Sequence, residues 1–201
     1  VLSPLPLKTI TLLYHSGWSI ERIFQLCFQR MNNIKNAPGA SGPTPKNAPQ
    51  FKKFLEAIKY LRELQTLDVL NLTYSNNSGS PQIVLHINDE GKNLKAAQKF
   101  SRLLHLEPGL GRYFISFSQK QNGFGEIRVV TRSLLGVLFY LSQGVEAPQQ
   151  DVKAGKVTRT LKKSGEVFDW KEVTGEILRV RSQSKRPDNA ALRVFYRGTW
   201  F

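Results

Sequence analysis

The stretch EIRVVTRSLLGVLFYLSQGVEAP, residues 126–148, decides the expected fold because its hydrophobic period changes partway along. Its first seven residues alternate between two faces, one formed by Ile127, Val129 and Thr131 and the other by Arg128, Val130 and Arg132. Such alternation is typical of a half-buried strand. This predicted strand leads directly into the second part of the stretch, which starts at Ser133.

The second part of this stretch predicts a helix over residues 134–141. Ser133 can cap its N-terminus, and its residues leave almost no polar face, which favours burial. Gly136 is unfavourable inside a helix, so we expect a strand or another helix packed closely against it. Gly144 is suited to a C-cap and Pro148 prevents continuation. We expect this helix to be the most buried element of the chain.

The N-terminal third is expected to be helical. Residues 7–17 fit either a strand or a helix, and we favour a helix with Pro6 near its first position and Gly17 at its end. Ser19 caps a second predicted helix that ends at Asn32 and has an apolar stripe: Ile20, Ile23, Phe24, Cys27, Met31 and Ile34. These two helices are interpreted as a core helical hairpin rather than a DNA-binding helix-turn-helix. A third helix is predicted over residues 50–66.

The remainder is dominated by strand patterns. A hairpin is predicted from residues 69–74 and 83–88, followed by a helix over 94–106. A second hairpin pairs residues 112–118 with the strand that starts at Glu126, and four more strands are expected at 156–161, 166–170, 177–181 and 191–196. This order predicts an α+β fold, with an N-terminal helical hairpin and third helix, then a mostly antiparallel sheet with two covering helices.

We expect residues 1–66 to form a helical segment packed on the sheet domain of residues 67–201, the two together being one cooperative unit. The longest apolar run, residues 134–141, is far shorter than the roughly 20 residues that span a bilayer. A single cysteine excludes an internal disulfide and a multi-cysteine zinc site. Cys27 lies on an apolar helical face and is expected to be buried and functionally silent.

The sequence contains no recognisable catalytic constellation. Its histidines, His15, His86 and His105, fall in separate elements without an acidic or cysteine neighbour at metal-ligand spacing. Asp169 and Glu172 are the best available acid–base pair, and a solvated loop explains them equally simply. We therefore expect no catalytic residue, no cofactor and no metal site, and a protein that is not an enzyme.

The net charge of +14 favours acidic partners. If the strands align, one sheet face carries Arg128, Arg132, Arg179, Arg181, Arg193 and Arg197. Such a face could bind phosphates and stack a base, although a solvated sheet face has the same pattern. The second candidate contact is the loop of residues 38–49, which is stiffened by Pro38, Pro43, Pro45 and Pro49.

Several segments together resemble the C-terminal region of an uncharacterised family of Gram-negative bacterial proteins that are predicted envelope lipoproteins. These segments are PLPLKTITLLYHSGWSIERIFQLCFQRMN, NAPGASGPTP, TRSLLGVLFYLSQGVEAP, VRSQSKRP and YRGTWF. The resemblance implies a periplasmic protein, anchored to the outer membrane by an N-terminal lipid outside this chain. It brings no catalytic or ligand residues with it.

Together these observations predict a non-enzymatic interaction or structural domain of a cell-envelope lipoprotein, working within a larger protein assembly. The expected partners are other envelope proteins and anionic lipid headgroups. The alternative is a nucleic-acid-binding domain that uses the arginine-rich face. Salt dependence separates the two, because phosphate binding weakens steeply as salt is added.

Overall fold

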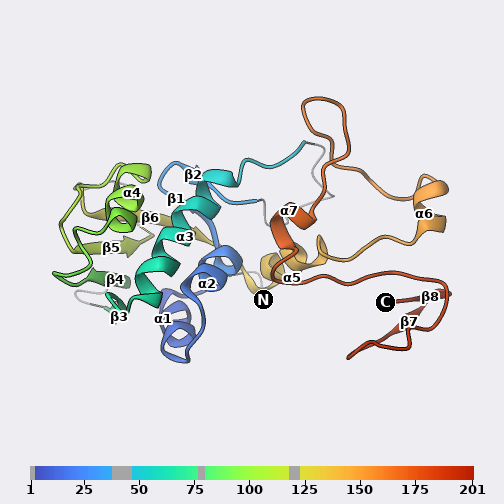
Figure 1. The fold of residues 1–201 in the computed structure, drawn as a ribbon, viewed down its shortest axis with the longest axis horizontal. Coiled ribbons are helices and arrows are strands. Elements are labelled where there is room, and N and C mark those ends of the chain that lie inside the picture. Colours follow the sequence, from blue (N-terminus) through green and yellow to red (C-terminus); the bar gives the residue numbers. More distant parts are fainter. Residues whose placement is uncertain (1–2, 38–46, 77–79, 118–122) are drawn as a thin grey trace. The chain divides into compact units, whose positions relative to one another are not determined.

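The computed structural model describes residues 3–37, 47–76, 80–117 and 123–201 (Figure 1). Within these residues the fold is α+β, as predicted, with seven helices, one six-stranded sheet and a separate two-stranded sheet. The chain divides into two compact units. Unit 1 comprises Val1–Gly39 and Gln50–Val137, and unit 2 comprises Ala40–Pro49 and Leu138–Phe201.

The large sheet belongs to unit 1 and has the strand order β2-β1-β6-β5-β4-β3. Its strands are β1 (Phe28–Met31), β2 (Ile34–Lys35), β3 (Leu70–Ser75), β4 (Gln82–Ile87), β5 (Arg112–Ser116) and β6 (Glu126–Thr131). All neighbours pair antiparallel except β5 and β6. The strand of the opening stretch, β6, thus lies in the middle of the sheet.

Four helices of unit 1 share the hydrophobic core with this sheet (Figure 1). They are α1 (Leu7–His15), α2 (Ile20–Cys27), α3 (Lys52–Thr66) and α4 (Lys95–Leu103). Alternate residues of β4 and β6 are buried, which is the pattern of a sheet with one covered face. The core contains four fully buried phenylalanines: Phe24, Phe28, Phe54 and Phe100. The helix favoured over residues 7–17 is present as α1, and Gly17 follows it with a φ of 85°.

The second predicted helix ends earlier than expected, at Cys27. The chain then forms the hairpin of β1 and β2, and Met31 pairs with Val129 of β6. Asn32, expected at a helix end, instead occupies the turn with a φ of 47°. Its side chain accepts a hydrogen bond from the Arg128 N–H at 2.9 Å and donates to the Leu104 carbonyl at 3.0 Å. The apolar residues Phe28 and Met31 could be buried in a helix or in a strand. The strand forms because β1 pairs with β6.

The predicted antiparallel hairpin of residues 112–118 with the Glu126 strand is wrong, because β5 and β6 pair in parallel. Residues 124 and 125, just before β6, already lie beside the beginning of β5. The N–H of Glu107 donates to the carbonyl of Phe124 at 3.0 Å, and that of Phe114 donates to Gly125 at 2.9 Å. A short connection favours a hairpin by itself, and these contacts override that preference.

The helix of the opening stretch, α5 (Leu134–Ser142), is not the most buried element. Leu134 is 52% exposed and Leu138 is 55% exposed, whereas Tyr140 is fully buried. Gly136 packs against the side chain of Arg132, 3.3 Å from the position its Cβ would take, rather than against a strand or another helix. The helix begins in unit 1 and ends in unit 2. An apolar surface permits burial on every side, but burial also needs an element that packs there.

Unit 2 contains little regular structure. Its elements besides the end of α5 are α6 (Gln149–Lys153), α7 (Lys171–Thr174), β7 (Phe195–Tyr196) and β8 (Thr199–Trp200). The four strands predicted between residues 156 and 196 are reduced to single bridges, such as Leu161 with Val167, and to the two residues of β7. The apolar residues Leu192, Val194 and Tyr196 of the last segment are exposed. These segments have the alternating pattern of strands, but they do not pair with the six-stranded sheet.

The division between units therefore differs from the predicted boundary at residue 66. Helices α1, α2 and α3 bury their apolar faces against the sheet and belong with it in unit 1. Whether the two units unfold in one cooperative transition stays a prediction.

Cys27 is buried, as expected. Burial raises the pKa of its thiol to about 11, and the nearby Arg132 guanidinium lowers that pKa by less. At pH 8 only about one thiol in a thousand would then be the reactive thiolate.

We expect iodoacetamide at pH 8 to label Cys27 in the native protein at least ~100-fold more slowly than in urea, because the thiol is both protonated and inaccessible. The measurement is the rate of alkylation by mass spectrometry. Equal rates in native buffer and in urea would contradict this placement of Cys27.

Candidate binding site

The six arginines predicted to share one sheet face do not do so. Arg128 and Arg132 belong to unit 1, whereas the other four belong to unit 2 and lie outside the six-stranded sheet. The prediction of a shared face assumed that residues 177–181 and 191–196 align as strands beside β6. In the structure these segments contribute one isolated bridge and the short strand β7.

Arg132 is fully buried, in contrast to its predicted place on an exposed face. One terminal nitrogen donates to the carbonyls of Gln25 and Leu26 at 2.8 Å and of Phe28 at 2.9 Å. The other donates to the carbonyl of Ala37 at 2.6 Å. The carbonyls at the end of α2 lack partners within the helix, so the guanidinium serves as their cap. Arg132 is therefore a structural residue of unit 1.

Three of the remaining arginines do lie together, around a cavity of about 560 Å³ in unit 2. Arg179, Arg181 and Arg193 line it with Trp200 and Phe201, and we name it the arginine cavity. The described residues that line it include no carboxylate. Arg193 is tethered by a hydrogen bond of 3.0 Å to the Pro187 carbonyl. The sequence thus identified the arginines, while the assumed strand alignment misplaced them.

Arg197 does not line the arginine cavity. It occupies the turn between β7 and β8 with a φ of 48°, followed by Gly198 with a φ of 75°. Two successive residues with positive φ are the signature of a tight hairpin turn that matches strand twist. Arg197 is therefore an exposed turn residue, and its guanidinium lies 5.5 Å from the centroid of the Tyr196 ring.

The candidate proline loop is described only at its end. Pro38, Pro43 and Pro45 lie outside the described residues, and Pro49 is half-buried. Just before it, the N–H of Ala48 donates to the Leu161 carbonyl at 2.9 Å. The role of this loop as a partner contact stays a prediction.

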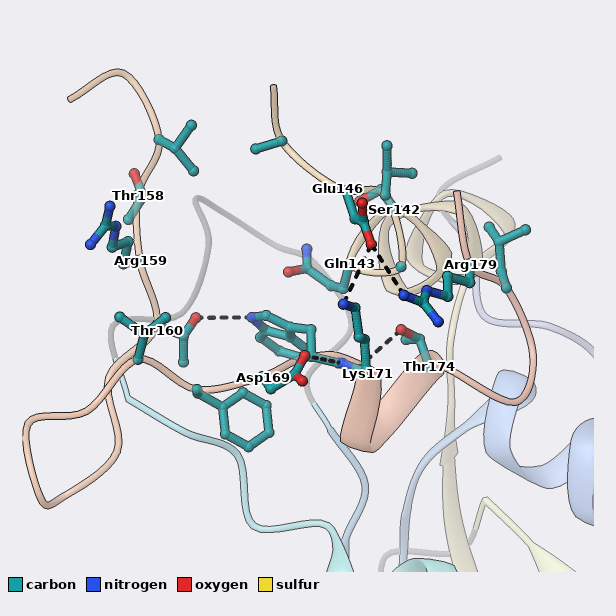
Figure 2. Close-up of a pocket in the computed structure, with 18 of the residues that line it drawn as sticks. Ser142, Gln143, Glu146, Thr158, Arg159, Thr160, Asp169, Lys171, Thr174 and Arg179 are labelled. Atoms are coloured by element: carbon teal, nitrogen blue, oxygen red, sulfur yellow. Dashed lines mark hydrogen bonds and ion pairs between the residues drawn. The ribbon is translucent and has the colours of Figure 1, made fainter. Parts of the chain in front are cut away.

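A second cavity in unit 2, of about 550 Å³, is shown in Figure 2. We name it the polar cavity. Residues 157–160 line one side, with Thr158 and Arg159 labelled there, and the opposite side carries Glu146, Lys171 and Arg179. Gln143 and Asp169 contribute further polar groups, and apolar contacts come from Phe139, Val145, Val157, Val167, Phe168 and Leu178. A few convergent polar groups in a mainly apolar hollow are typical of small-molecule sites.

Two cations converge on one carboxylate in the polar cavity. An oxygen of Glu146 lies 3.4 Å from the ammonium of Lys171 and 3.6 Å from a terminal nitrogen of Arg179 (Figure 2). Glu146 lies in the segment that follows α5, and its N–H donates to the Val180 carbonyl at 2.9 Å. A single oxygen at these distances leaves most of the donors of both cations available to a ligand.

The short helix α7 holds the lower side of the polar cavity in place. The indole N–H of Trp170 donates to the hydroxyl of Thr160 at 3.1 Å, which joins the two sides. A carboxylate oxygen of Asp169 accepts the Lys171 N–H at 2.9 Å, and the Thr174 hydroxyl donates to the Trp170 carbonyl at 3.2 Å (Figure 2). These contacts fix the backbone from which Lys171 extends.

The sequence drew attention to Asp169 but paired it with Glu172. Glu172 does not line the polar cavity and forms an ion pair with Lys162 at 3.7 Å. Glu146, Lys171 and Gln143 were missed, because no short-range spacing connects residues 143–146 with residue 171. In the described part of the chain no group of three or more histidine, cysteine or acidic residues could hold a metal ion.

No protein-family model, curated protein or solved structure matches this chain. Among the described residues, no helix is long and apolar enough to cross a membrane.

Proposed function

We propose that the protein is a non-enzymatic interaction domain of a bacterial envelope lipoprotein and that it contacts an acidic protein partner within a larger assembly. The contact surface consists of the arginine cavity and the exposed apolar side chains beside it. The envelope setting, with an outer-membrane lipid anchor and neighbouring anionic headgroups, is supported by the sequence resemblance.

The observation that carries this proposal is the exposure of successive large apolar side chains next to the arginines. Leu192 is 85% exposed and Phe195 is 57% exposed, and Val194 and Tyr196 are exposed to similar degrees. Contiguous apolar surface on a protein marks a contact site more often than isolated residues do. Arginine and aromatic residues are also the types enriched in protein interfaces.

The local structure supports a role in binding. Strands β7 and β8 form a two-stranded sheet that pairs Phe195 with Trp200. A two-stranded hairpin is only marginally stable by itself in water, so a partner that covers it would stabilise it. The ring centroids of Phe195 and Trp200 lie 4.9 Å apart, which gives the hairpin an aromatic surface to present.

The charge of the surface specifies the partner's chemistry. The described residues that line the arginine cavity include no carboxylate, although Arg179 also pairs with Glu146, outside this lining, at 3.6 Å. Charge complementarity therefore favours a partner segment with acidic and apolar side chains. Nucleic acid is the second candidate, because arginines beside Trp200 could also bind phosphates and stack a base.

We expect Arg181→Gln with Arg193→Gln to reduce the recovery of partners from an envelope extract at least tenfold, about 1.4 kcal/mol of binding free energy. Phe195→Ser should do the same by removing apolar contact area. The measurement is quantitative mass spectrometry of proteins retained by the immobilised chain. Arg102→Gln, at an exposed position of α4 in unit 1, is the matched control and should recover the same proteins as the parent.

Salt concentration distinguishes the two partner classes. Binding of an acidic protein partner should weaken only about tenfold between 0.05 M and 0.5 M salt, because salt screens the arginine contacts but not the apolar and aromatic ones. Nucleic-acid binding should fall by orders of magnitude over the same range. Identical partners recovered by the parent and by both cavity variants, all three being folded, would contradict the proposed surface.

A further inference from the structure

We propose that the polar cavity of unit 2 binds a small anionic carbohydrate, a polyhydroxylated body carrying one phosphate or carboxylate group. The cavity holds cations whose hydrogen-bond donors a single glutamate does not occupy, together with groups that bind hydroxyls. This inference does not rest on the proposed function, because it concerns a different cavity; the two linings have only Leu178 and Arg179 in common, and the partner experiment does not change Arg179.

The anionic group is assigned to Lys171 and Arg179. Both contact Glu146 at ion-pair distance, so their charged ends lie close to one another. A lysine ammonium has three donors and an arginine guanidinium has five, and an arginine donor pair suits the geometry of a phosphate or carboxylate. An anion that takes the place of the Glu146 carboxylate could therefore bind both cations at once.

Exchange of Glu146 for a ligand anion costs little. The side chains of Glu146, Lys171 and Arg179 are 33%, 47% and 42% exposed. Ion pairs with this exposure contribute little stability, because water screens them and ordering of the long side chains opposes them. Glu146 thus keeps the two cations in position for a ligand without holding them tightly.

The hydroxyl-bearing body is assigned to the rest of the cavity. Thr158 and Gln143 offer both donors and acceptors, and the carboxylate of Asp169 offers acceptors. Trp170 and Phe168, whose rings lie 5.3 Å apart, provide apolar surface for the faces of a sugar ring. A volume of about 550 Å³ falls in the range of small-molecule sites.

The test is isothermal titration of the whole chain with four probes: glucose 6-phosphate, glucuronate, glucose and inorganic phosphate. We expect at least one of the two anionic sugars to bind about tenfold or more tightly than both glucose and inorganic phosphate. The preferred one identifies the anionic group as phosphate or carboxylate. Comparable binding of all four probes, or no saturation by either anionic sugar at millimolar concentration, would overturn the proposal.

Two substitutions that should change the affinity for the sugar in opposite directions locate the site. Lys171→Met should weaken binding of the preferred sugar about tenfold or more by removing a cation, whereas Glu146→Gln should strengthen it several-fold by removing the competing carboxylate. Lys153→Met, in α6 and outside the cavity lining, should bind like the parent. Unchanged affinity in both cavity variants would also refute the assignment. A folding defect from Lys171→Met leaves Glu146→Gln as the deciding measurement, since a damaged fold does not increase affinity.

These results stand apart from the partner experiment. Failure of sugar binding would leave the arginine cavity and its apolar surroundings as an interaction surface. Loss of partner recovery in the arginine variants would not affect binding of the anionic sugar, because neither Arg181 nor Arg193 lines the polar cavity.

Discussion

Replacing Arg132 with methionine should lower the free energy of unfolding of unit 1 by about 3–5 kcal/mol, since roughly 1–3 kcal/mol is lost for each buried carbonyl left without a donor. Arg132 donates to the carbonyls of Gln25, Leu26, Phe28 and Ala37. Methionine fills a similar volume but supplies no donor. The carbonyls of Leu26 and Ala37 would then lose this donor, whereas those of Gln25 and Phe28 would keep hydrogen bonds of 2.8 Å from the Asn36 side chain.

Urea unfolding followed by circular dichroism measures this effect. Arg30→Met is the matched control, since Arg30 lies in β1 of the same sheet and is exposed. It should change the free energy of unfolding by less than about 0.5 kcal/mol. Arg132→Lys should fall between the two, because an ammonium keeps the charge but lacks the planar fork that reaches several carbonyls. A methionine variant as stable as the control would show that Arg132 is not a structural cap.

Replacing Gly144 with alanine should destabilise unit 2 by about 1–3 kcal/mol, the usual cost of forcing extra atoms into a packed site. A Cβ at this position would overlap the carbonyl oxygen of Leu178, which is a backbone atom and cannot rotate away. A hydrogen bond of 3.0 Å from the Val180 N–H to the Gly144 carbonyl connects the same two segments of the chain. The methyl group would therefore separate the chain segments that carry Glu146 and Arg179.

Hydrogen exchange of the Val180 and Glu146 amides is the suitable measurement, because both donate between these two segments. We expect their protection to fall about tenfold or more in the alanine variant, which corresponds to roughly 1.4 kcal/mol. Gly123→Ala is the control, since nothing lies within 4 Å of the Cβ it would add. Protection equal to that of the parent would mean that the contact of residue 144 with Leu178 is looser than the structure shows.

In the arginine cavity, three residues that an incorrect strand alignment had grouped nevertheless lie together. Alternation within each strand pattern selected Arg179, Arg181 and Arg193, and the structure brings these three together. The same reasoning placed Arg132 with them, although it is buried in unit 1. A period of two residues assigns a side chain to a face only while the strand continues, and β6 ends at Thr131.

Local pattern alone determined the elements whose stabilising contacts lie close by in the chain. The helix α3, the hairpin of β3 and β4 and the buried position of Cys27 follow from hydrophobic period and turn residues, whereas for α1 the period left a strand as an alternative. These features confine apolar side chains to one face, and any covered sheet would accept that face. The α+β class follows for the same reason.

Only the tertiary structure decided the features that depend on which partner an apolar or charged residue meets. Phe28 and Met31 became strand residues because β6 offered hydrogen bonds, and the parallel pairing of β5 with β6 depends on where the intervening chain returns. The polar cavity joins Glu146 to Lys171 across 25 positions of sequence. A periodic pattern records the orientation of each residue about its own element, whereas such contacts depend on the relative positions of elements that local sequence does not specify.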